Sequence, residues 1–152
     1  MTLEEIIKFD EAFKQNFKIT PTYTGSTSLW LDGVIDRLPK DIDIVLDEIS
    51  YGLLLEHETA LEYEGEEHVT LVLDNIKVDV FPDKNYPTKN ISRNGEIFCI
   101  TRSKVSIEKK KKYISKYISM LNEGTFLTPS AMISLTKHIN DINKYNSEIF
   151  PF

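Results

Sequence analysis

The sequence has a single cysteine, Cys99, among 152 residues. One thiol excludes an internal disulfide framework and suits a reducing compartment such as the cytoplasm. Cys99 lies in the apolar run formed by residues 97–100. That setting favours a small buried strand residue over a catalytic thiol.

Long apolar runs and an excess of basic charge are also missing. No run could cross a bilayer, and residues 1–8 are acidic and mixed, unlike a signal peptide, so we expect no membrane partner. The chain has 18 Lys and Arg against 24 Asp and Glu, a formal net charge of −6. This argues against non-specific coating of nucleic acid, which depends on neutralising phosphates. Residues 109–112 remain as a local basic run.

The sequence contains no repeat, no low-complexity tract and no long linker rich in Pro, Gly or Ser. Its 41% hydrophobic and 28% charged content is that of an ordinary globular domain. We therefore predict one domain over residues 1–152, with a core at about 18–103 and C-terminal helices at about 104–146.

Helical spacing of apolar residues marks both ends of the chain. It predicts a helix over residues 3–17, a short helix over 26–34 and a longer helix over 106–121. Thr128-Pro129 is a good start signal for a last helix. The apolar stripe of that helix comprises Met132, Leu135, Ile139 and Ile142.

Strand patterns occupy the middle of the chain. Residues 41–46 alternate as a half-buried strand does, and 59–63 and 68–73 predict further strands around Gly65. Asp74-Asn75 separates two apolar runs and predicts a tight hairpin. Residues 96–101 predict another strand at an edge of the sheet. Strands between terminal helices indicate an α+β domain.

The segment Thr24-Gly25-Ser26 is the first candidate for chemistry, because it joins an extended segment to a helix. Glycine lets a ligand approach the backbone closely, and free N–H groups at the start of a helix suit a phosphate. Gly-Ser is also a common turn, so this segment alone does not decide between the two.

The acidic pair Asp41 and Asp43 is the second candidate. Residues two apart on a strand point the same way, so both carboxylates share one face while Ile42 and Ile44 pack into the core. Carboxylates that repel each other need a cation or open water, and Mg²⁺ is the natural cation for such a pair. The alternative is a solvated strand end.

Asp79 is the third candidate, within the apolar segment of residues 76–81. A lone carboxylate is costly to bury unless it is paired or binds a metal. The alternative is that the strand period turns Asp79 to water, opposite Val78 and Val80.

Together, the three segments resemble the signature of the nucleotidyltransferases of the DNA polymerase β superfamily. In that superfamily a Gly-Ser turn opens a helix, an acidic pair follows on the next strand, and a third acidic residue lies on a neighbouring strand. The resemblance runs from about Tyr23 to Phe81 and more loosely through the last helices. It implies a mixed sheet flanked by helices. The gap between Ser26 and Asp41 is slightly long, which indicates an extended loop.

The resemblance implies roles for five residues. Gly25 and Ser26 would hold the β- and γ-phosphates of a nucleoside triphosphate. Asp41 and Asp43 would bind two Mg²⁺ (or Mn²⁺) ions, and Asp79 would complete the second metal site and help deprotonate an acceptor hydroxyl. A nucleoside monophosphate would pass to the acceptor and pyrophosphate would leave.

Other residues are weaker candidates. Lys110 and Lys111 could reach the triphosphate from the helix, or their stems could cover the edge of the core. Arg37 could meet phosphate, or be an ordinary loop arginine. Lys137, His138 and Asp141 fit a pattern of Lys or His followed by Asp seen in some relatives. Alternatively, Lys137 and Asp141 form an exposed i,i+4 pair.

Two functions from different classes follow. One is an active nucleotidyltransferase whose acceptor is a small molecule, an RNA or a protein. The other is a retired nucleotidyltransferase fold that serves as a structural or binding subunit, in a phage particle or a toxin–antitoxin module; a phage-encoded protein would then be associated with the virion. Because the additions to the core are short, the resemblance also suggests a homodimer or a partner protein.

Overall fold

A central mixed sheet carries the fold of this computed structural model, which describes residues 1–56, 61–63, 68–82 and 87–149. Within these ranges the sheet has seven strands in the order β3-β4-β5-β2-β1-β7-β6. The strands are β1 Thr22–Tyr23, β2 Ile42–Leu46, β3 Leu61–Tyr63, β4 Val69–Leu73, β5 Ile76–Pro82, β6 Thr88–Arg93 and β7 Glu96–Thr101. The helices are α1 Leu3–Phe17, α2 Gly25–Leu31, α3 Glu48–Glu56, α4 Ser103–Asn122 and α5 Pro129–Ile149.

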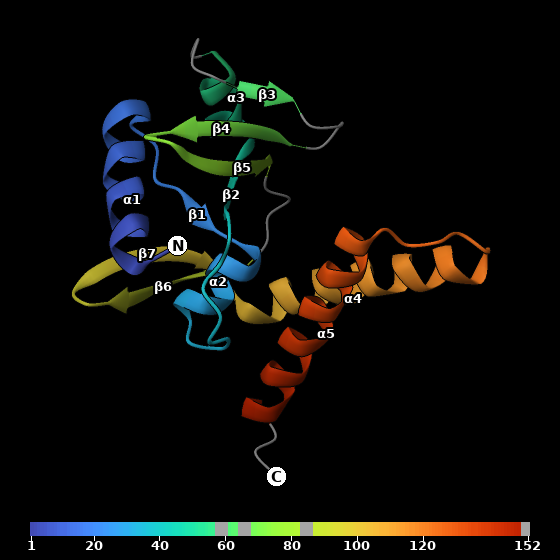
Figure 1. Cartoon of the computed structure of the whole chain (residues 1–152). Helices are drawn as coiled ribbons and strands as arrows, with labels where there is room; N and C mark the ends of the chain where they lie inside the picture. Colours follow the sequence, from blue (N-terminus) through green and yellow to red (C-terminus); the bar gives the residue numbers. More distant parts are fainter. Residues whose placement is uncertain (57–60, 64–67, 83–86, 150–152) are drawn as a thin grey trace.

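The middle of the sheet joins strands that are distant in sequence. β2 runs parallel to β5 and β1 runs parallel to β7, whereas β1 and β2 are antiparallel. This sheet with helices at both ends confirms the predicted α+β class. α4 and α5 cross each other and extend away from the sheet (Figure 1).

α1 supplies much of the core on one side of the sheet. Thr2 caps it by accepting a hydrogen bond from the Glu5 amide at 3.2 Å, and Lys18 ends it in the left-handed region at φ 58°. Its inward stripe is Ile6, Phe9, Phe13 and Phe17, all buried. The helix predicted over residues 3–17 from its 3.6-residue period is therefore confirmed.

The predicted hairpin at Asp74-Asn75 is confirmed. Both residues have positive φ, 50° and 64°, as a two-residue turn between antiparallel strands requires. The predicted strand over residues 59–63 is described only at Leu61–Tyr63; Thr59, Ala60 and Gly65 lie outside the described residues.

Two elements escaped the sequence patterns. β6 is polar, with Ile91 as its one apolar residue, yet it pairs with β7 through a turn at Asn94-Gly95, both with positive φ. Because β6 is the outer strand, the prediction that residues 96–101 form an edge was wrong. α3 was missed because its apolar residues follow no clear helical stripe, and Ile49 remains 78% exposed.

The stripe predicted for the last helix is only partly buried. Met132 and Ile139 are exposed, whereas Ile142 packs with Tyr145 against a small cluster around Leu29 and Ile107. Polar and charged contacts, described below, hold α5 in place beside this cluster. In the described part of the chain, no helix is both long and apolar enough to span a membrane.

We expect Phe13→Ala to lower the free energy of unfolding by roughly 3–5 kcal/mol, because it opens a cavity in the core under the sheet. Phe126→Ala is the matched control: Phe126 is 95% exposed, so its loss should change stability by less than about 0.5 kcal/mol. Urea unfolding measures both. Equal effects of the two changes would contradict the assignment of the core.

Candidate active site

The Gly25 turn lies directly against the acidic strand. The Thr24 amide donates to the Asp43 carbonyl at 2.9 Å, which ties the start of α2 to β2. Gly25 has φ 60°, and a Cβ built there would lie 3.0 Å from Asp43 Oδ2. A residue without a side chain is therefore needed, both for the backbone conformation and for the close approach of the carboxylate.

The three aspartates converge. Asp43 on β2 and Asp79 on β5 are direct partners in the parallel register, and Asp41 immediately precedes β2. All three line one cavity of about 270 Å³, together with Ser26 of the Gly-Ser turn. Thr70 on β4 donates to Asp79 Oδ1 at 2.9 Å and so orients that carboxylate. Asp79 therefore does not simply turn to water, because it is half-buried and hydrogen-bonded beside the acidic pair.

Asp43 is the most perturbed of the three carboxyls. Burial, followed by the charges of Asp79 and Asp41, raises its pKa to about 7, although Lys110 and Lys109 act in the opposite direction. Carboxylates crowded in this way are stabilised in their charged form by a cation.

The three aspartates fit a divalent metal that takes only some of its ligands from the protein. Among the described residues, no three His, Cys, Asp or Glu side chains lie closely enough together to hold a metal ion as a group. Mg²⁺ does not need three protein ligands, since it binds one or two carboxylates and keeps water and substrate phosphates as its other ligands. Asp41, Asp43 and Asp79 supply oxygen ligands of this kind.

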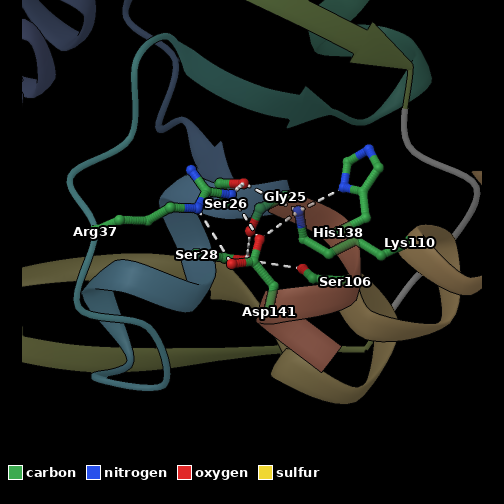
Figure 2. Close-up of polar contacts among 8 residues, drawn as sticks. All are labelled: Gly25, Ser26, Ser28, Arg37, Ser106, Lys110, His138 and Asp141. Carbon is green, nitrogen blue, oxygen red and sulfur yellow. Dashed lines mark hydrogen bonds and ion pairs between the residues drawn. The ribbon is translucent and has the colours of Figure 1, made fainter. Parts of the chain in front are cut away.

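A cluster of charged side chains surrounds Ser26 (Figure 2). Ser26 Oγ accepts hydrogen bonds from Arg37 Nη2 at 2.9 Å and from Lys110 Nζ at 3.0 Å. Both cations also contact Asp141 on α5, with Arg37 Nη2 at 2.5 Å and Lys110 Nζ at 3.0 Å from Asp141 Oδ2. Lys110 is 4% exposed and Asp141 2% exposed. Two cations and one carboxylate are thus gathered beside the Gly-Ser turn.

His138 completes the cluster. Its Nδ1 lies 3.2 Å from Lys110 Nζ, and burial, followed by the positive charge of Lys110, lowers its pKa to about 4. A neutral His138 can accept a hydrogen bond from the Lys110 ammonium at Nδ1, which assigns its own proton to Nε2. The His138 ring stacks on Tyr113 of α4, with centroids 5.5 Å apart.

A larger cavity, of about 540 Å³, opens on the other side of Asp43. It shares Ser26, Asp43 and His138 with the smaller one. Four lysines of α4 line it, namely Lys109, Lys110, Lys112 and Lys116. Phe81, Pro82 and Tyr113 add apolar and aromatic surface. The site therefore has a larger compartment lined by lysines and a smaller one that holds the three aspartates together with Arg37, Lys40 and Lys137, and both border Asp43.

The structure distinguishes among the weaker candidates for phosphate binding. Arg37 and Lys110 point into the site, so neither is an ordinary surface cation. Lys111 lines neither cavity; it is exposed and lies 3.5 Å from Glu108, which removes it from the candidate phosphate ligands. The reason is helical geometry, because adjacent residues on a helix point about 100° apart.

The expected surface pair of Lys137 and Asp141 was wrong. Asp141 is buried and pairs with Arg37 and Lys110, while Lys137 is exposed and lines the smaller cavity. Tyr113, Phe81 and Lys116 were not singled out from the sequence. The only signal available was the helical spacing that puts Lys109, Tyr113 and Lys116 on one side of α4.

Comparisons with known proteins bear on the fold. No family model matches the chain, and no curated protein matches it significantly. Among solved structures, the chain is similar to the crystal structure of a "putative nucleotidyltransferase" from Thermotoga maritima, with a TM-score of 0.55 and 19% sequence identity. The match covers 81% of this chain and 96% of that one. The chain therefore has the nucleotidyltransferase fold, which the sequence predicted.

Gly25→Ala and Gly33→Ala form a matched pair, because both positions have positive φ but only Gly25 contacts Asp43. Alanine at either position should lower stability by about 1 kcal/mol through backbone strain. Only Gly25→Ala should also displace the Asp43 carboxylate and weaken Mg²⁺ binding, by roughly 10-fold. Urea unfolding and Mg²⁺ titration test this. Equal Mg²⁺ affinities in the two variants would contradict the proposed contact.

Asp43→Asn should stabilise the metal-free protein at alkaline pH. The folded-state pKa of Asp43 is raised from 3.8 to about 7, so the folded state binds the extra proton and stability falls as pH rises through this window. At pH 8 the variant should therefore melt about 2–5 °C above the wild type, with no gain below pH 4. Melting curves from pH 3.5 to 8 measure the difference. A lower melting temperature of the variant at pH 8 would rule out this effect.

Proposed function

We propose that this protein is a metal-dependent nucleotidyltransferase, which moves a nucleoside monophosphate from a nucleoside triphosphate to a hydroxyl acceptor and releases pyrophosphate. One observation carries the proposal. Three aspartates from two separate segments of the chain meet the Gly25-Ser26 turn, where a compartment lined by lysines adjoins the smaller one that holds the aspartates.

The nucleoside triphosphate occupies the larger, basic compartment. Ser26 and the backbone at Gly25 bind the terminal phosphates. Lys110 offsets their charge from within this compartment, and Arg37, which lines the smaller one, does so from its contact with Ser26. Phe81, Pro82 and Tyr113 provide surface against which a base can pack. The size of about 540 Å³ lies in the range of small-molecule sites.

Asp41, Asp43 and Asp79 would hold Mg²⁺ or Mn²⁺ between the nucleotide and the acceptor. When bound, such ions stabilise the charge that develops on the attacking and leaving oxygens. Of the three aspartates, only Asp43 lines both compartments, so its carboxylate is the one that both substrates can share.

The acceptor hydroxyl enters the smaller compartment beside Asp79, which lines that compartment and not the larger one. Its oxygen forms a bond to the α-phosphorus, and the bond from that phosphorus to the oxygen bridging to the β-phosphate breaks. The hydroxyl proton passes to the Asp79 carboxylate, and pyrophosphate leaves beside Lys110 and Arg37. Thr70 keeps Asp79 oriented for this step.

The acceptor class stays open between a small molecule, an RNA and a protein. Apolar side chains exposed on α4 and α5 suit a second copy of the chain or another protein that would help to close the site. They include Ile118, Leu121, Met132, Ile133 and Ile139. The second candidate function is a binding or structural subunit that has lost catalysis. One measurement distinguishes it from the first.

That measurement is transfer of label from α-³²P nucleoside triphosphates, with Mg²⁺ or Mn²⁺, to a panel of small-molecule, RNA and protein acceptors. Asp43→Asn should reduce transfer by roughly 100-fold or more, because it removes the carboxylate shared by both compartments. Asp47→Asn is the control: Asp47 follows β2 and caps α3 through the Ser50 amide, outside the site. Metal-dependent transfer by Asp43→Asn at the wild-type rate would refute the mechanism. Absence of transfer by the wild type would favour the binding subunit.

A further inference from the structure

Asp141 lies far from the catalytic strands in sequence and does not line either cavity, yet it is the most completely paired carboxylate of the site. One of its oxygens accepts from Arg37 Nε at 3.1 Å, and the other contacts Arg37 Nη2 and Lys110 Nζ. Because Asp141 is 2% exposed, its charge has little help from water and depends on these two partners.

The two cations depend on Asp141 in return. Arg37 and Lys110 donate to the same hydroxyl oxygen, Ser26 Oγ, so two positively charged groups contact one atom. Like charges at that separation repel strongly in a partly buried site. Asp141 bridges them, as Figure 2 shows.

We propose that Asp141 is a positioning residue that holds Arg37 and Lys110 on Ser26, so that both cations face the terminal phosphates of the nucleoside triphosphate. The proposal rests on the function proposed above. Asp141 does not touch the substrate; it acts through its two partners. Because Asp141 holds the two repelling cations together before the triphosphate binds, the phosphate site is preorganised.

The electrostatics of Lys110 support this assignment. Burial lowers the Lys110 pKa, and Asp141 is the largest influence that raises it; Arg37 lowers it and Asp43 raises it, with His138 the remaining titratable neighbour on α5. Without Asp141, the ammonium would lose its closest counter-charge, and the half-buried Arg37 would be free to turn to solvent.

A competing role is purely structural, since Asp141 also fastens α5 to the loop that carries Arg37. The chain offers a matched control for that role. Lys144 of the same helix pairs with Asp36 of the same loop at 3.2 Å, outside the site. Asp36→Asn therefore removes an ion pair between the same two elements and leaves the cations beside Ser26 in place.

The test compares the wild type, Asp141→Asn and Asp36→Asn. The ligands are nucleoside triphosphates, the corresponding monophosphates and inorganic tripolyphosphate, which carries the phosphates without a base. We expect Asp141→Asn to weaken triphosphate and tripolyphosphate binding by about 10-fold and monophosphate binding by less than about 3-fold. Asp36→Asn should leave all affinities within about 2-fold. Calorimetry or fluorescence titration gives the dissociation constants, and melting curves confirm that each variant is folded.

A second arm asks whether Asp141 acts through Lys110. In a Lys110→Met background, Asp141→Asn should weaken tripolyphosphate binding by less than about 3-fold, because one partner is already gone. An equal loss in both backgrounds would overturn the proposal. Unchanged or tighter triphosphate binding by Asp141→Asn alone would also overturn it, since Asp141 would then be a structural anchor or a competitor for the cations.

If Asp141→Asn does not fold, Asp141→Glu replaces it, because glutamate keeps the charge but shifts it by one methylene. A loss of at least about 3-fold in tripolyphosphate affinity relative to Asp36→Glu would support positioning, and unchanged affinity would overturn it. Binding without transfer in the wild type would refute the proposed catalysis and still allow this test. Transfer by the wild type with normal affinity in the Asp141 variant would refute only the positioning role.

Discussion

Repulsion between like charges is the constraint on which the rest of this site depends. Asp41, Asp43 and Asp79 border one small cavity, and burial, together with the charges of Asp79 and Asp41, raises the pKa of Asp43 to about 7. A few ångströms away, Arg37 and Lys110 share one hydroxyl oxygen. Neither group would assemble alone, because each costs free energy to concentrate. Their proximity, together with Asp141, lets each offset part of the other's charge.

The fold supplies this proximity through elements of two kinds. The register of β2 and β5 sets Asp43 beside Asp79, and the β1–α2 turn brings Gly25 against the same carboxylate. The cations, by contrast, lie on a loop and on α4, and Arg37 of the loop pairs with Asp141, a carboxylate 104 positions along the chain. α4 and α5 extend from the sheet and bury few large apolar side chains. The ion pairs that fasten α5 beside the Gly-Ser turn are therefore also part of the site.

Local sequence patterns predicted most of the fold and the acidic strand of the site. The α1 stripe, the Asp74-Asn75 turn and the acidic strand are short-range signals, because period and turn chemistry act within a few residues. β6 and α3 were missed because β6 is polar and α3 lacks a clear stripe, so that pairing and packing with distant residues define both. Lys110 and Lys111 were equivalent in the sequence, and only the placement of α4 turned one inward and left the other beside Glu108.

The sequence by itself determined that Asp41 and Asp43 would share a face of one strand and that a glycine would open the helix before it. Those are consequences of backbone geometry, which needs no distant partner. The tertiary structure alone decided that Asp79 would face that pair and that Asp141 would be buried between Arg37 and Lys110. The physical reason is that a charged side chain is stable in water anywhere on the surface, but can be buried only where the fold brings a counter-charge from a distant part of the chain.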